Sequence, residues 1–307
     1  MNMIDGAWYS EVYRQTVFIV LAFIFISGFI VYFFRNKNHY FIASWASIKS
    51  WLIAAPLLFG ALGLPSPFPL ITLTLLAIFG AKVFFQILGM YHRSWFVLIC
   101  YFGIFWLAYC VHTNQIEHYN LAPMIVLGLS LLVPLIRNNF KWMIQYISLT
   151  LLAFAFMGWS FMHTGLILKW ESGIYQLMYL IILTEFCDNT IFAINRYVGK
   201  TKIVDGINPK RTVEATGISI ILTLILAFAM RHLLPAGAEK FWLSSGLIAA
   251  IGGGIGDLIM TVVRRDLGIR DYGAFIIGRG DFLQRMDRLI FVAPIYYYFM
   301  KYYESQL

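Results

Sequence analysis

The sequence predicts an all-α integral membrane protein, folded as a polytopic bundle of about ten transmembrane helices. Of its 307 residues, 60% are hydrophobic and only 12% are charged, whereas about 25% of residues are charged in a soluble globular protein. The apolar residues also form long uncharged runs, such as 16–34 and 143–162. Runs of about 18 or more apolar residues are typical of helices that cross a bilayer.

Ten apolar segments predict the individual spanning helices. In chain order they are 16–34, 41–64, 68–90, 95–112, 121–136, 142–162, 174–195, 213–233, 241–261 and 286–303. The second is the least regular, because Lys49 lies inside it and Pro56 near its middle, so nine helices are the alternative. The first is predicted to stay as an anchor, because Asp5 and Glu11 precede it where a signal peptide would carry positive charge.

The basic residues alternate between the two ends of the predicted helices. Sixteen of the 23 Lys and Arg residues fall in the loops after the odd-numbered segments, and five fall on the opposite side. The positive-inside rule then places these loops in the cytoplasm and both termini outside. The net charge of +8 therefore fits membrane topology, and we expect no nucleic acid as a partner. We expect a protein of the bacterial inner membrane, surrounded by membrane lipid; a homo-oligomer is compatible with the sequence.

The chain divides into two regions with different charge patterns. Residues 1–180 are predicted to be membrane scaffold helices, and 181–307 to be a membrane catalytic region, because acids and bases concentrate from Glu185 onward. Glu185 and Asp188 are three residues apart and share a helix face, and Asp257 closes the ninth segment. Acids at membrane depth normally face a bundle interior or a wet cavity. The alternative is that they pair with arginines and only hold helices together.

A glycine run, GGGIG at 252–256, directly precedes Asp257. No predicted strand comes before it, so it does not match a phosphate-binding glycine loop. Small residues let membrane helices approach closely. We interpret the run as a packing motif that also sets the position of Asp257.

Two basic loops carry the residue types of a phosphate site. The loop at 264–288 holds six arginines, no lysine and four interleaved aspartates. Arginine presents a planar fork of donors that suits phosphate oxygens, and aspartate suits a hard cation such as Mg²⁺. This combination at a membrane face indicates phosphoryl or nucleotidyl transfer. A loop whose charges merely neutralise one another is the alternative.

The stretch GDLIMTVVRRDLGIRDYGAFIIGRGDFLQRMDRLIF resembles the signature of the phosphatidate cytidylyltransferases, also called CDP-diacylglycerol synthases. The family's G-D-L falls on 256–258, its K-R on 264–265, its K-D-x-G on 270–273, its P-G-H-G-G on 277–281 and its D-R-x-D on 284–287. Upstream, Asp188, the pair 199–200 and the stretch 208–215 fit the family's D-x-x-A-Y, G-K and S-P-x-K-T-x-E-G patterns. The chain departs from the family at Arg279, Asp281 and Gln284, where the family has histidine, glycine and aspartate, so it looks like a divergent member.

The resemblance implies a membrane nucleotidyltransferase that moves CMP from CTP to a lipid phosphate such as phosphatidate, with Mg²⁺ as cofactor. The products would be a CDP-lipid and pyrophosphate, and the site would lie on the cytoplasmic face. The implied catalytic residues are Asp257, Arg265, Asp271 and Asp287, and the implied metal ligands are Asp257, Asp281 and Asp287. The implied substrate-binding residues are Asp188, Lys200, Arg211, Thr212, Arg264, Arg270 and Arg285.

The departure at Gln284 leaves alternatives open. Asp281 lies one helical turn earlier and could replace the missing carboxylate, or it could simply cap the helix, with Gln284 completing a capping box. A non-catalytic relative that binds lipid phosphate is therefore the second hypothesis. A transporter is the third, although transporters pair broken helices in related halves and here charge is loaded into one half.

Overall fold

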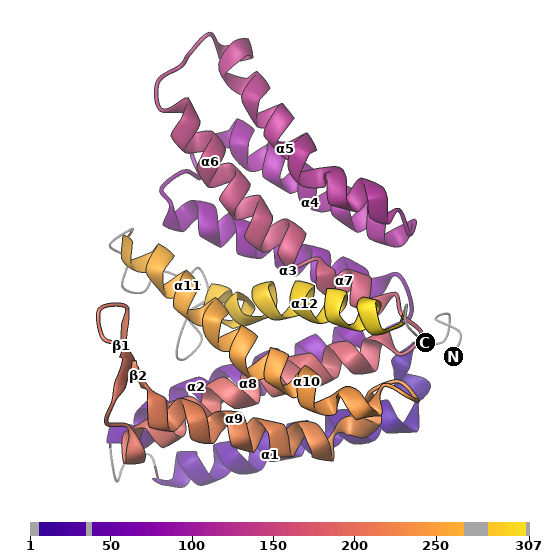
Figure 1. Cartoon of the computed structure of the whole chain (residues 1–307), viewed down its shortest axis with the longest axis vertical. Helices are drawn as coiled ribbons and strands as arrows, with labels where there is room; N and C mark the ends of the chain where they lie inside the picture. Colours follow the sequence, from indigo (N-terminus) through magenta and orange to yellow (C-terminus); the bar gives the residue numbers. More distant parts are fainter. Residues whose placement is uncertain (1–5, 35–38, 267–281, 305–307) are drawn as a thin grey trace.

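The computed structural model describes residues 6–34, 39–266 and 282–304 (Figure 1). At 39–44, 46–47, 209–210, 282–286 and 304 it describes the backbone alone. All ten predicted segments are helical in the described part of the chain. The main helices are α1 (Glu11–Phe34), α2 (His39–Leu62), α3 (Phe68–Ile87), α4 (Ser94–His112), α5 (Ile116–Arg137), α6 (Met143–Ala153), α7 (His163–Leu168), α8 (Gly173–Val198), α9 (Val213–Ala229), α10 (Trp242–Leu247), α11 (Gly253–Asp266) and α12 (Phe282–Glu304).

Two of the ten helical stretches contain a π-helical segment. The segment η2 (Phe154–Ser160) directly follows α6 and precedes α7, and η5 (Ile248–Gly252) connects α10 to α11. The predicted segment 142–162 therefore ends too early, because the apolar helical stretch continues to Leu168. Both π-helical segments contact α12. Such segments are uncommon and occur often near functional sites, and η5 ends one residue before the helix that carries Asp257.

The predicted fold class, a polytopic all-α membrane protein, is confirmed. Seven helical stretches among the described residues are long and apolar enough to cross a membrane: Glu11–Phe34, Phe68–Ile87, Ser94–His112, Ile116–Arg137, Met143–Leu168, Gly173–Val198 and Glu239–Asp266. Among the residues whose side chains are described, α2 and α9 contribute shorter apolar stretches, Ile48–Leu62 and Val213–Ala229. Large apolar side chains such as Phe18, Phe23 and Phe25 on α1 are exposed, as expected where lipid rather than water covers a helix.

The helices form two groups joined by α12 (Figure 1). In that view α4, α5 and α6 lie at the top, α1, α2, α8 and α9 lie at the bottom, and α12 runs between them. The helix α12 contacts α3, α7, α8 and α11. One hydrophobic cluster includes Tyr13 of α1, Phe84 of α3, Tyr179 of α8 and Tyr296 of α12. The two regions divided near residue 180 therefore share a core, and α12 is held on several sides.

A short β-hairpin lies between α8 and α9, where the sequence suggested only a loop. Its strands β1 (Lys202–Val204) and β2 (Asn208–Thr212) pair antiparallel, with Lys202 opposite Thr212. Figure 1 shows the hairpin at the end of the molecule where α8 ends and α9 begins. The opposite end brings Tyr175, near the start of α8, to Ser10, just before α1, with 2.6 Å between their hydroxyl oxygens.

Candidate functional site

The buried charges of the second region meet in one cluster near the hairpin end of the helices. The members are Glu185 and Asp188 of α8, Arg211 of β2, Asp257 and Arg264 of α11, and Asp287 and Arg288 of α12. Four carboxylates therefore face three guanidinium groups. Charges removed from water are costly unless they are paired and hydrogen-bonded, and each of these side chains has an ionic partner in the cluster.

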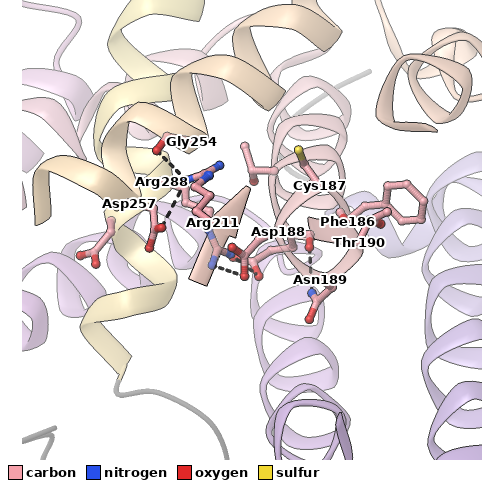
Figure 2. A network of polar contacts seen from close by, with 12 residues as sticks. Phe186, Cys187, Asp188, Asn189, Thr190, Arg211, Gly254, Asp257 and Arg288 are labelled. Atoms are coloured by element: carbon pink, nitrogen blue, oxygen red, sulfur yellow. Dashed lines mark hydrogen bonds and ion pairs between the residues drawn. The ribbon is translucent and has the colours of Figure 1, made fainter. Parts of the chain in front are cut away.

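Arg211 ties β2 to the start of α11. Its Nη1 lies 3.3 Å from Oδ2 of Asp257 and donates a shorter hydrogen bond, 2.8 Å, to the carbonyl of Gly254. Figure 2 shows both contacts from the same guanidinium group. A Cβ added at Gly254 would lie 2.6 Å from Nη2 of Arg211, so the absence of a side chain at 254 makes room for the arginine.

Arg288 ties α12 to α8. Its Nη1 lies 3.0 Å from Oε2 of Glu185. Its Nη2 lies 2.5 Å from Oδ2 of Asp188, and Figure 2 labels both Arg288 and Asp188. The two acids share a helix face, as their spacing predicts, and one guanidinium group bridges both. Arg288 also attracts the carboxylates of Asp257 and Asp287 electrostatically. Among the three arginines of the cluster, Arg288 thus forms ion pairs with two carboxylates, those of Glu185 and Asp188.

Asp287 and Arg264 form the third ionic contact, between α12 and α11. The Asp287 side chain is 0% exposed, whereas that of Arg264 is 18% exposed. The two helices approach closely here, because a Cβ added at Gly256 would lie 2.6 Å from the backbone oxygen of Asp287. The glycine run is thus a packing motif that lets α11, which carries Asp257, approach α12, which carries Asp287.

A second layer of contacts fixes the hairpin loop beside the cluster. Thr212 caps α9, because its hydroxyl oxygen accepts a hydrogen bond from the amide of Ala215 at 3.4 Å, and the same hydroxyl donates to Asn195 at 2.5 Å. The carboxylate of Glu214 accepts from the amides of Lys200 and Thr201, each at 3.1 Å. These contacts hold the backbone at Lys200, next to the hairpin.

The two basic loops meet in their described parts. Arg265 donates a 2.7 Å hydrogen bond to the carbonyl of Gly206 in the hairpin turn, and Arg211 reaches α11 as described above. The structure therefore brings five of the predicted site residues together in the cluster: Asp188, Arg211, Arg264, Asp257 and Asp287. Three more predicted residues lie around the cluster: Thr212, Lys200 and Arg265. Three predicted residues, Arg270, Asp271 and Asp281, lie outside the described residues, and the side chains of Gln284 and Arg285 are also outside them.

Two members of the cluster were not predicted as site residues. The sequence marks Glu185 only as an acid at membrane depth, and Arg288 only as one of six arginines in its loop. The signal for Arg288 is indirect: two acids on one buried helix face require a nearby cation. The sequence offers several arginines for that role, and only the fold selects Arg288.

Of the three metal ligands that the family resemblance implies, Asp257 and Asp287 are described, and both carboxylates are buried. In the described part of the chain, no group of three or more His, Cys, Asp or Glu side chains could hold a metal. Mg²⁺, however, is usually bound by one or two carboxylates together with waters and substrate phosphates. Two buried hard-oxygen donors on adjacent helices fit an ion that arrives with a phosphate, rather than an ion enclosed by protein alone.

Comparison with known proteins adds a family to this geometry. The sequence profile of the cytidylyltransferase family matches residues 45–303, which includes most of the first region as well as the whole cluster. The uncharacterized protein YnbB of Escherichia coli (strain K12) is 32% identical over 132 residues, 43% of this chain and 44% of that protein.

Proteins named phosphatidate cytidylyltransferase are also similar to the chain. That of Staphylococcus aureus (strain COL) is 26% identical over 161 residues, 52% of this chain and 60% of the relative. That of Staphylococcus saprophyticus is 27% identical over 183 residues, 59% of this chain and 68% of the relative. The similarity thus spans less than two thirds of the length of YnbB and of the S. aureus enzyme.

Proposed function

This chain belongs to the cytidylyltransferase family, and we propose that it transfers CMP from CTP to a lipid phosphate of the phosphatidate type. The products are a CDP-lipid and pyrophosphate. The names of the staphylococcal relatives support this choice of reaction. The proposed site is the buried cluster around Asp257 and Asp287, with residues 181–307 as the catalytic region and 1–180 as its membrane scaffold.

One observation carries the proposal. Asp257 and Asp287, which align with aspartates of the family signature, lie on helices that approach closely at Gly256, and each carboxylate is paired with an arginine. Carboxylates for a cation and arginines for phosphate oxygens are the two groups that nucleotidyl transfer requires in one place. Arg211 and Asp257 are 46 positions apart in the sequence and Arg264 and Asp287 are 23 apart, so the fold brings each pair together.

In the proposed reaction, an oxygen of the lipid phosphate attacks the α-phosphorus of CTP. A new P–O bond forms, the bond between the α- and β-phosphates breaks, and pyrophosphate leaves. Arg211, Arg264 and Arg265 neutralise phosphate charge, and Lys200, held by the Glu214 contacts to its loop, adds a further positive charge. Mg²⁺ held by Asp257 and Asp287 would supply charge neutralisation on the triphosphate.

The position of the cluster suits substrates of different solubility. It lies near the ends of membrane helices, beside the charged hairpin, so a two-chain lipid can stay in the bilayer while a nucleotide arrives from water. The excess of Lys and Arg in these loops supports a site on the cytoplasmic face of a bacterial inner membrane.

The competing proposal is a non-catalytic relative that binds lipid phosphates. Two observations favour it: Gln284 stands at a family aspartate position, and each described acid of the cluster has an arginine partner. Both proposals expect the protein to bind phosphate. Only the first expects turnover.

The test uses purified protein in detergent with a panel of nucleoside triphosphates and lipid phosphates, with and without Mg²⁺. The proposal expects a CDP-lipid only when CTP, a lipid phosphate and Mg²⁺ are all present. Asp257→Asn serves as the inactive control. Phosphate-lipid binding without any product would support the non-catalytic relative instead.

A further inference from the structure

Arg211 and Arg264 hold the two carboxylates that a metal ion would need. We infer that these arginines make cation binding conditional on phosphate: phosphate has to draw the guanidinium groups away before a divalent cation can take Asp257 and Asp287. The inference rests on the proposed function, since it assigns an order of events to that site.

The contact between Arg264 and Asp287 blocks the access of a cation to a buried carboxylate. The Asp287 side chain has no exposed surface, so a cation can reach it only after a neighbour moves. Arg264 is the partly exposed member of the pair, and it lies in the last turn of α11. Its Nε is buried and has no hydrogen-bond partner in the described part of the chain. Arg264 therefore has a donor to spare for a phosphate oxygen.

The contact between Arg211 and Asp257 is the longer of the two that Nη1 of Arg211 makes. Nη1 of Arg211 lies 3.3 Å from the carboxylate but only 2.8 Å from the carbonyl of Gly254. The shorter bond does not involve Asp257. Arg211 can thus lose the carboxylate to a cation and still be held by the carbonyl, with its other donors turned to phosphate.

Charge balance explains why the order should matter. A divalent cation that entered alone would lie beside the guanidinium groups of Arg211 and Arg264 and within the electrostatic reach of Arg288, and like charges in a poorly solvated site repel strongly. A phosphate supplies the acceptors that an arginine fork prefers. Two arginine–carboxylate pairs are then replaced by arginine–phosphate and carboxylate–cation pairs, so no buried charge is left unpaired.

Arg288 takes no part in this exchange. It bridges Glu185 and Asp188 at 3.0 and 2.5 Å, and neither acid is a proposed cation ligand. These contacts keep α12 docked on α8 while Asp287 changes its partner.

The experiment measures the thermal unfolding midpoint of the full-length protein in detergent as a function of Mg²⁺ concentration, without and with inorganic pyrophosphate. A ligand that binds the folded state raises this midpoint, and the rise gives an apparent Kd. For the wild type we expect weak binding of Mg²⁺ alone. In Arg264→Met, the apparent Kd for Mg²⁺ alone should fall at least about tenfold, within the range of about 5- to 150-fold usual for coupled sites.

Three further variants make the result specific. Arg211→Met should also tighten binding of Mg²⁺ alone, and it provides the test if Arg264→Met does not fold. Arg264→Met combined with Asp287→Asn should lose the gain, because the released carboxylate is the expected ligand. Lys202→Met is the matched control, since Lys202 is an exposed base of the same hairpin that pairs with Asp205, and it should leave Mg²⁺ binding unchanged.

Equal Mg²⁺ affinity in the wild type and in both arginine variants would overturn the inference. Assaying CDP-lipid formation with the wild-type preparation separates this failure from failure of the proposed function. Product formation without the tenfold gain would refute only the order of binding. The tenfold gain without product would support the exchange at a site with a different reaction.

Discussion

Replacing Gly256 with alanine tests whether the close approach of α11 and α12 sets the geometry of the site. The added Cβ would lie 2.6 Å from the backbone oxygen of Asp287 and 2.9 Å from Cδ2 of Phe291. Ordinary contact begins near 3.4 Å, so the helices have to separate by about 0.8 Å at this point. The neighbouring atom is backbone, so no side-chain rotation can relieve the clash.

The expected effect on stability is small and the expected effect on activity is large. Overpacking of this kind costs about 1–3 kcal/mol, and the better helix propensity of alanine offsets about 1 kcal/mol of that. The net loss is therefore at most about 2 kcal/mol. A misplacement of about 1 Å between reacting groups can reduce turnover about 100-fold. Gly256→Ala should thus fold, unfold a few degrees earlier and lose most of its CMP transfer.

The matched control is Gly253→Ala, three residues earlier in the same helix. Its added Cβ would meet Arg288 Cβ at 3.6 Å and Thr184 Cγ2 at 3.7 Å, which are ordinary contacts. Turnover and the unfolding midpoint of both variants should be measured on the same preparations. Wild-type turnover in Gly256→Ala, or an equal loss in Gly253→Ala, would show that the helix contact does not position the site.

The remaining predictions concern the charges themselves. Asp257→Asn should lower CMP transfer by at least about 10- to 100-fold, the loss that even a change to a partner of a metal ligand causes. It should destabilise the fold by only about 1–3 kcal/mol, because Arg211 keeps its bond to Gly254. Unaltered turnover would remove Asp257 from the site. Arg288→Met should lower the free energy of unfolding by about 3–5 kcal/mol, because it leaves two partly buried carboxylates without their cation. Replacing Glu185 and Asp188 with neutral residues in the same variant should recover most of that loss, measured by chemical unfolding. No recovery would mean that the ion pairs do not hold α12 to α8. If Asp281 is a relocated metal ligand, Asp281→Gly should lower turnover, and adding Gln284→Asp to that variant should restore part of it. If Asp281 is only a helix cap, Asp281→Ser should keep normal turnover, because serine also caps a helix.

The sequence predicts the helices well because lipid exposure requires long apolar runs. The run 16–34 lies inside α1, which begins at Glu11. Hydropathy detects the part of a helix that contacts lipid, while backbone hydrogen bonding continues into the polar residues before it. The π-helical segments could not be predicted, because they differ from α-helix in hydrogen-bond spacing and not in the pattern of apolar residues. The hairpin could not be predicted either, since strands of three and five residues depend on each other for pairing.

The site was predictable in residue types but not in partners. Acids at membrane depth and an arginine-only loop indicate where charge must gather, and Asp257, Arg264 and Asp287 do lie together. Which arginine pairs with which acid depends on helix rotation and on the glycine contacts at 254 and 256. For this reason Arg288, one arginine among six, gave no signal of its own.

The most direct test of the account is CMP transfer by the purified protein reconstituted in lipid vesicles. CTP labelled in the α-phosphate and phosphatidate are supplied with Mg²⁺, and the label is followed into lipid while pyrophosphate is measured. We predict labelled CDP-lipid and pyrophosphate in equal amounts from the wild type, and neither from Asp257→Asn. A folded wild-type protein that labels no lipid, with CTP or with any other nucleoside triphosphate, would contradict it.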